Sequence, residues 1–321
     1  MIDHYRKLYA NYITRPNSDI PVIKNINSPQ YITEQQFYQI QSISKDIISR
    51  STYSLLPYYF LSADISTQLQ DEFLSKKNMG NCVSFAHMII DDLRDKDIHT
   101  GIIIPATLPT QFIQLGYPIF SHVAIMLETE TNFIIFEPTY FIIEPIVIPK
   151  NGTDLRINIT VLNTEWIYKY IDGSQTIIVT NLDGSELFYY KIAEIANPSE
   201  SVSHPINAIN KRITIVKFDP VINKKIAHLS IRIDTKKLES YNTSDGWYPR
   251  FDWSSISDNS DYNEICKSLL EWEGVSLTQC IAFGYEQIVL ANMIIAIILE
   301  NNKKCNDGTF SSDDEYSLHN W

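Results

Sequence analysis

The chain has 321 residues, with 26 Lys and Arg against 38 Asp and Glu, and its formal net charge is −12. This length allows one large domain or two modest ones, and a composition of 44% apolar and 20% charged residues excludes a disordered chain. The acidic balance argues against a general nucleic-acid binder, because such proteins need clustered Lys and Arg.

Capping residues and the spacing of apolar residues predict three helices in the first third of the chain. Thr33 and Gln36 fit a capping box at the start of the first. In the third, which begins near Asn81, apolar residues recur at helical spacing. The three helices are expected at residues 33–49, 67–77 and 81–96, and a buried strand at 100–105.

Short β-type runs fill the middle of the chain, and turn signals such as Asp183-Gly184 separate several of them. The polar and aromatic stretch at 240–260 favours a loop, and residues 262–302 return to helix before an acidic tail. The order of helices, strands and helices predicts an α+β fold. The strands are expected at 122–127, 133–137, 156–162, 166–171, 176–181, 187–192, 212–218 and 227–233.

The four cysteines point to neither a disulfide framework nor a metal site. They are few and scattered, and no pair has the Cys-x-x-Cys spacing of a structural zinc site. The N-terminus lacks the apolar segment of a signal peptide, and the uncharged stretch at 287–299 is too short to cross a bilayer. We therefore expect a soluble, cytoplasmic protein with no metal, no membrane partner and no nucleic-acid partner. The cysteines are Cys82, Cys266, Cys280 and Cys305.

The segment from Met79 to Ala86 carries the clearest chemical signal. Asn81 is a good helix N-cap, so Cys82 would occupy the first helical turn, where the positive end of the helix dipole stabilises a thiolate. Gly80 would let the preceding backbone bend. The backbone N–H of Cys82 would be a natural donor to an oxyanion, and Cys82 is the predicted nucleophile.

A thiolate nucleophile needs a base and an orienting group. If strands 122–127 and 133–137 form a hairpin centred between Thr129 and Glu130, His122 lies directly opposite Glu137 on one sheet face. A one-residue slip would place the two on opposite faces. In the predicted register the carboxylate holds one imidazole nitrogen and aims the other at the sulfur, which is a Cys-His-acid arrangement.

Each of these candidate residues also has a possible role that is purely structural. A lone cysteine on an amphipathic helix is usually a small buried apolar residue, so the case for Cys82 depends on His122 and Glu137 occurring with it. Asn78 and Asn81 are candidates for binding an oxyanion through their side-chain amides. We prefer the alternative that Asn81 caps the helix and Asn78 belongs to a turn.

Two motifs resemble the transglutaminase-like superfamily. Gly80-x-Cys82-x-x-Phe85-Ala86, with Leu93-Arg94 at the end of the same helix, resembles that superfamily's nucleophile helix. His122 followed by Phe136-Glu137-Pro138-Thr139 resembles its His strand and F-D-P-T strand end. The resemblance covers about residues 65–145 and implies a papain-like cysteine fold, shared by arylamine N-acetyltransferases, in which Cys82, His122 and Glu137 come together.

The sequence departs from these families at three points. Glu137 stands where the superfamily usually has Asp, and Val123-Ala124 stands where transglutaminases commonly have an aromatic residue. The R-G-G-x-C-x-E-x-N pattern of arylamine acetyltransferases is absent. With the resemblance, residues 1–148 are expected to form a catalytic core with N-terminal helices, and residues 149–321 a β-rich extension with closing helices.

The resemblance implies thiol-dependent acyl transfer or amide hydrolysis without a cofactor. Cys82 would attack an amide or thioester carbonyl, His122 would take its proton, and Glu137 would stabilise the imidazolium. By analogy the substrate is a peptide or glutamine-type amide, and the partner a protein, a peptide, or a small amide or amine. Two alternatives stay open: an inactive interaction module of the same fold, and an acetyl-CoA-dependent N-acetyltransferase.

Overall fold

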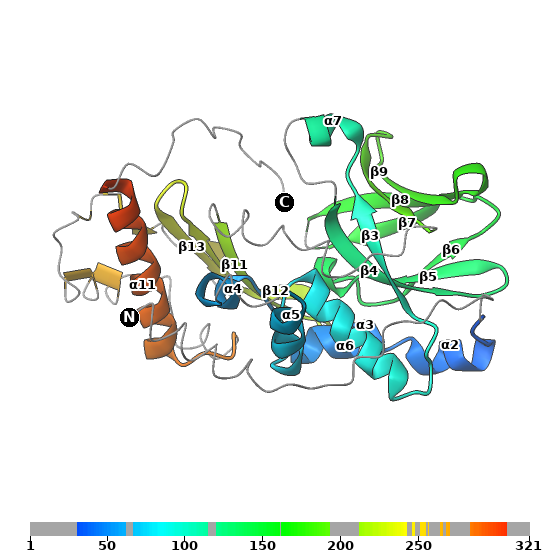
Figure 1. The fold of residues 1–321 in the computed structure, drawn as a ribbon, viewed down its shortest axis with the longest axis horizontal. Helices are drawn as coiled ribbons and strands as arrows, with labels where there is room; N and C mark the ends of the chain where they lie inside the picture. The colour runs from blue at the N-terminus through cyan, green and yellow to red at the C-terminus, as the bar shows by residue number, and fades with distance from the viewer. Residues whose placement is uncertain are drawn as a thin grey trace.

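The computed structural model describes residues 31–61, 67–114, 120–160, 162–192, 212–242, 246–247, 251–254, 256, 264–265, 268–269 and 283–306. Within these ranges helices and two mostly antiparallel sheets share the chain, which confirms the predicted α+β class. Figure 1 shows the larger sheet on the right, α11 with β11 and β13 on the left, and α3, α5 and α6 along the bottom between them. The helices are α2 (Glu34–Ile40), α3 (Ile43–Arg50), α4 (Leu56–Phe60), α5 (Thr67–Lys76), α6 (Cys82–Arg94), α7 (Thr110–Gln114) and α11 (Gln287–Asn306).

The capping box predicted at the first helix is present. The hydroxyl of Thr33 accepts from the backbone N–H of Gln36 at 3.2 Å, and the Gln36 side chain accepts from the backbone N–H of Thr33 at 2.9 Å. The single helix predicted through residue 49 is instead two helices, α2 and α3. The break falls at Ser42, the N-cap residue of α3, whose hydroxyl donates to the Asp46 carboxylate in the first turn of that helix at 2.7 Å.

The larger sheet has eight strands in the order β6-β5-β4-β3-β10-β9-β8-β7, all paired antiparallel. It curls, because β6 at one end contacts β7 and β8 at the other. Ala124, Met126 and Phe188 belong to the core enclosed by this curl. Its strands are β3 (Ile102–Thr107), β4 (Phe120–Glu128), β5 (Asn132–Phe136), β6 (Ile146–Pro149), β7 (Leu155–Ile159), β8 (Thr164–Ile171), β9 (Thr176–Asn181) and β10 (Glu186–Lys191).

Residues alternate between two cores along β4, as expected for a strand covered on both faces. Ile125 and Leu127 point to a second core, in which they pack with Phe85 and Ile89 of α6, while Ala124 and its even-numbered neighbours point inside the curl. Helix α6 therefore lies against the outer face of β4. This packing fixes the helix that begins at Cys82 against the strand that carries His122.

The second sheet joins segments from both ends of the chain. Strands β14, β13, β12, β11, β1 and β2 follow one another, β15 also pairs with β13, and only β1 with β2 is parallel. Its core packs against α4 and α11. Three of its strands occupy the stretch 237–252, where a loop was predicted for 240–260. The strands are β1 (Thr52–Ser54), β2 (Met79–Gly80), β11 (Arg212–Asp219), β12 (Lys224–Arg232), β13 (Lys237–Asn242), β14 (Gly246–Trp247) and β15 (Phe251–Asp252).

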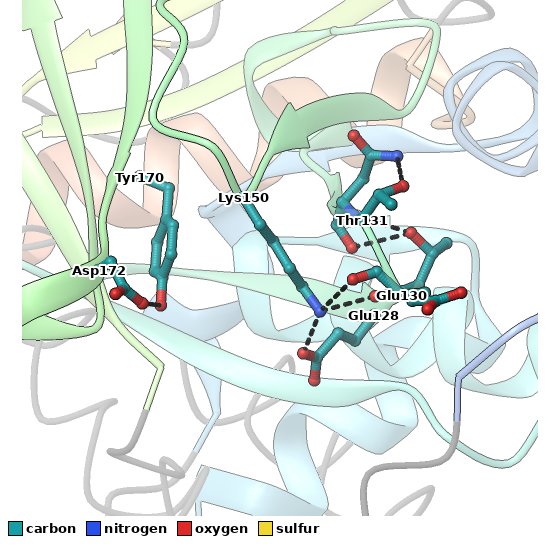
Figure 2. A network of polar contacts seen from close by, with 8 residues as sticks. Glu128, Glu130, Thr131, Lys150, Tyr170 and Asp172 are labelled. Atoms are coloured by element: carbon teal, nitrogen blue, oxygen red, sulfur yellow. Dashed lines mark hydrogen bonds and ion pairs between the residues drawn. The ribbon is translucent and has the colours of Figure 1, made fainter.

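The β4–β5 hairpin differs from its predicted register by two residues. Ile125 pairs with Phe136, because the turn is at residues 130–131 and the backbone N–H of Thr129 donates to the Asn132 carbonyl at 2.8 Å. Lys150 Nζ holds this turn by donating to the Glu128 carboxylate at 2.6 Å and to the Thr129 carbonyl at 2.7 Å, as Figure 2 shows. A shift of two preserves the side-chain parity, so the predicted partners stay on one face.

The predicted division at residues 148 and 149 stays a prediction. The larger sheet takes strands from both sides of this point, since β6 pairs with β5 and β10 pairs with β3. The helix predicted for 262–302 corresponds in part to α11, and the predicted acidic tail lies outside the described residues. Along the described part of the chain we find no helix with the length and apolar character needed to cross a membrane.

Candidate active site

Helix α6 begins as the sequence predicts. The side-chain oxygen of Asn81 accepts from the backbone N–H groups of Val83 at 2.9 Å and Ser84 at 3.4 Å, so its amide serves as the helix cap. Cys82 is the first residue of the helix, partly buried and unbridged. Asn78 is exposed in a turn with φ 53°, and its carbonyl accepts from the backbone N–H of Thr52.

Gly80 is required for this entry into the helix. Its φ is +131°, and a Cβ built on it would overlap the side chain of Ser84 and come within 3.3 Å of Leu74 Cβ. We expect Gly80→Ala to lower the free energy of unfolding by about 2–4 kcal/mol, through backbone strain and overpacking. Urea unfolding measures the change. Gly173→Ala is the matched control, since Gly173 has no atom within 4 Å of an added Cβ, and equal losses in both variants would contradict the prediction.

The structure brings His122 and Glu137 together. His122 Nε2 lies 3.9 Å from Glu137 Oε2, with His122 5% exposed and Glu137 1% exposed. Both are on the inner side of the curled sheet, where the His122 ring packs at 4.8 Å from the ring of Tyr140 in η1 (Pro138–Tyr140). Neither of the two facing atoms, Nε2 and Oε2, has another hydrogen-bond partner in the described part of the chain.

Glu137 is held by a residue that sequence reasoning missed. The hydroxyl of Tyr190 on β10 donates to Glu137 Oε1. Tyr190 reaches it because Tyr190 pairs with Ala106 and Ala106 pairs with His122, so the small Ala106 separates the two larger side chains across three strands. This bond occupies one carboxylate oxygen and leaves Oε2 toward the imidazole.

Cys82 approaches the same strand from the outer side. The sulfur faces the backbone of Val123, the residue after His122, and a hydrogen bond from that backbone opposes the rise in the pKa of the thiol that burial causes. Burial raises the pKa of Tyr140, and the charges of Glu137 and Cys82 raise it further. Cys82 therefore lies near the start of β4 and near Tyr140, whose ring packs on that of His122.

Burial sets the protonation states of these groups. It raises the pKa of Cys82 to about 12, so desolvation outweighs the lowering expected from the helix dipole. Burial also lowers the pKa of His122 to about 3 and raises the pKa of Glu137 to about 7, the latter against the opposing effects of the Tyr190 and Tyr168 hydroxyls. At neutral pH the thiol and the imidazole are both uncharged.

The other candidates lie elsewhere or serve the scaffold. His87 is on α6, and burial lowers its pKa to about 4. Cys266 and Cys280 fall outside the described residues, and Cys305 lies in the last turns of α11. In the described part of the chain, no three His, Cys, Asp or Glu side chains gather as metal ligands would.

Comparisons with known proteins find likeness in structure. No family model matches the chain, and a search of the curated proteins finds no match. Solved arylamine N-acetyltransferases resemble its fold. The Salmonella typhimurium enzyme has 11% identity and a TM-score of 0.48, covering 91% of this chain and 98% of that one. The Mycobacterium marinum enzyme in complex with CoA has 10% identity and a TM-score of 0.48, covering 82% and 93%.

A third solved structure is the Bacillus cereus arylamine N-acetyltransferase, described as having a unique Cys-His-Glu catalytic triad. It has 14% identity and a TM-score of 0.41, covering 75% of this chain and 93% of that one.

Proposed function

We propose that this protein is a thiol-dependent acyltransferase or amide hydrolase in which Cys82 is the nucleophile, His122 the base and Glu137 the orienting acid. The observation that carries the proposal is the buried pair of His122 and Glu137, whose facing atoms are 3.9 Å apart, with His122 on the strand whose Val123 backbone meets the Cys82 sulfur. A base oriented by a third group next to a nucleophile is the arrangement that covalent catalysis requires.

We assign a different role to each imidazole nitrogen. Because Nε2 faces Glu137, our proposal makes Nδ1 the nitrogen that accepts the proton of the Cys82 thiol as the sulfur attacks an acyl carbonyl. Because the resting thiol is neutral, proton transfer and attack are coupled rather than starting from a stored thiolate. The imidazolium that forms is stabilised by the Glu137 carboxylate, and each charge favours the other in the buried site.

The tetrahedral intermediate needs a donor for its oxyanion. The side chain of Asn81 is held with its oxygen on the helix N–H groups, and Asn78 is exposed in a turn, so we assign this role to the backbone N–H of Cys82 at the start of α6. Collapse of the intermediate returns the proton from His122 to the leaving group and leaves an acyl group on the sulfur. An amine or water then attacks this thioester with His122 again as base.

Trapping the acyl-enzyme tests the proposal. The full chain is incubated with p-nitrophenyl acetate, with a glutamine-containing peptide and with acetyl-CoA, then digested and mapped by mass spectrometry. Each of the four cysteines falls in a different tryptic peptide, and Cys82 is in residues 78–94. We expect an acyl adduct on this peptide that His122→Ala abolishes. The donor that forms it identifies the substrate class as an amide or a thioester.

The inactive interaction module predicts a different result. If the folded protein forms no acyl adduct on residues 78–94 with any donor, the proposed chemistry is wrong. Digestion yields all the peptides needed for this comparison from one sample.

A further inference from the structure

A second buried carboxyl lies behind the nucleophile. Asp71 on α5 is fully buried, and its Oδ1 accepts hydrogen bonds from the hydroxyl of Tyr58 on α4 and from Ser84 Oγ on α6 at 3.3 Å. Tyr58 and Ser84 also bond to each other, at 2.8 Å. Ser84 is two residues after Cys82, so the hydrogen bonds among Asp71, Tyr58 and Ser84 hold the first turn of α6 in place.

Burial of the Asp71 carboxyl destabilises the folded protein. Its second oxygen, Oδ2, is buried and has no hydrogen-bond partner among the described residues. Burial raises the pKa of Asp71 to about 7, while the bonds from Tyr58 and Ser84 act in the opposite direction. A neutral side chain of the same shape would avoid the cost of burying a partly satisfied charge.

The charge of Asp71 acts on Cys82. Among the causes that raise the pKa of the Cys82 thiol, the charge of Asp71 follows burial and opposes the backbone hydrogen bonds to the sulfur. In the part of the chain that the structure describes, the titratable groups that face Asp71 are Tyr58 from α4, Cys82 from α6 and Glu72 beside it on α5. None of these brings a positive charge to Asp71.

We propose that Asp71 is a positioning residue for Cys82: bound to Ser84, it fixes the first turn of α6 and holds a buried carboxylate against the turn that carries the thiol. This inference rests on the proposed function, which makes Cys82 the nucleophile. An ionised Asp71 beside this turn favours the protonated thiol, which suits a mechanism in which attack and proton transfer are coupled. This role explains why the chain keeps at Asp71 a carboxyl that destabilises the fold.

The test is the pH dependence of Cys82 alkylation. Asp71→Asn keeps the size of the side chain and an oxygen that can accept from Tyr58, but removes the charge. We expect iodoacetamide to label residues 78–94 of this variant roughly three- to tenfold faster than in the wild type at pH 8, and the rate to rise at lower pH. Asp95→Asn is the control, since Asp95 follows the far end of α6.

A second variant keeps the test decisive if Asp71→Asn does not fold. Tyr58→Phe removes a hydroxyl that stabilises the ionised carboxyl, so Asp71 stays neutral to higher pH and labelling should also be faster, by a smaller factor. Ser84→Ala removes the second bond to the same carboxyl, so labelling should shift in the same direction as in Tyr58→Phe, and by less. Thermal unfolding is followed in parallel for each variant.

The outcomes separate this inference from the proposed function. If Cys82 forms the acyl adduct in the wild type but folded Asp71→Asn and Tyr58→Phe have the wild-type alkylation profile, the role of Asp71 is wrong and the nucleophile stands. If no donor acylates Cys82 in the wild type, the proposed function fails first. A shift in Asp71→Asn with none in Asp95→Asn supports the inference.

Discussion

Replacing Cys82 with serine is expected to lower acyl transfer by about 10⁴- to 10⁶-fold, as loss of a catalytic nucleophile does. A serine hydroxyl is a weaker acid and a weaker nucleophile than a thiol, so the same imidazole of His122 activates it less well. The fold should persist, because the change replaces one partly buried atom. The rate of acyl release from the best donor measures the loss.

The matched control is Cys305→Ser, a change of the same chemistry within α11. We expect it to retain wild-type turnover, and both variants to unfold within about 1 kcal/mol of the wild type. If Cys82→Ser keeps more than a tenth of the wild-type rate with a normal unfolding transition, another residue carries the reaction.

The local features of the site could be predicted from the sequence. Asn81 is a helix N-cap, and the helical spacing of apolar residues begins directly after it. The start of α6 at Cys82 therefore depends only on residues close to it in the sequence. The hairpin is also local, yet its predicted register is wrong by two residues. The sequence Glu-Thr-Glu-Thr at 128–131 is compatible with a turn at more than one position. The turn at residues 130–131 is supported by Lys150, which directly follows β6 and binds Glu128.

The hydrogen-bond partners of the carboxyl groups of Glu137 and Asp71 could not be predicted in the same way. Tyr190 is 53 residues from Glu137 and meets it only because β10 pairs with β3. No short-range pattern encodes that strand order. Asp71 is different: it lies three residues before Leu74, a buried position of α5, so helical periodicity alone would have placed a carboxyl on the apolar face. The protonation states depend on burial, which a motif does not contain.

Glu137→Gln is expected to lose activity while gaining stability at neutral and alkaline pH. The amide can still accept from Tyr190, but it presents an N–H or a neutral oxygen to His122 Nε2 and can no longer stabilise the imidazolium. By analogy with other triads, removing the charge of the orienting acid lowers turnover by about 10²- to 10⁴-fold. Turnover with the best acyl donor at pH 7.5 measures this loss, and Tyr190→Phe, which keeps the carboxylate, should lose less.

The stability change has the opposite sign, and its pH dependence follows from the raised pKa. Glu137 titrates near pH 7 in the folded chain against 4.5 for the free group, so its contribution is fully present below about pH 4.5 and is lost as the pH rises through 7. Glutamine does not titrate. The unfolding free energy of Glu137→Gln relative to the wild type should therefore rise by roughly 3 kcal/mol between pH 4 and pH 8. Urea unfolding at several pH values measures it, and parallel curves for the two proteins would mean that Glu137 is not buried as an acid beside His122.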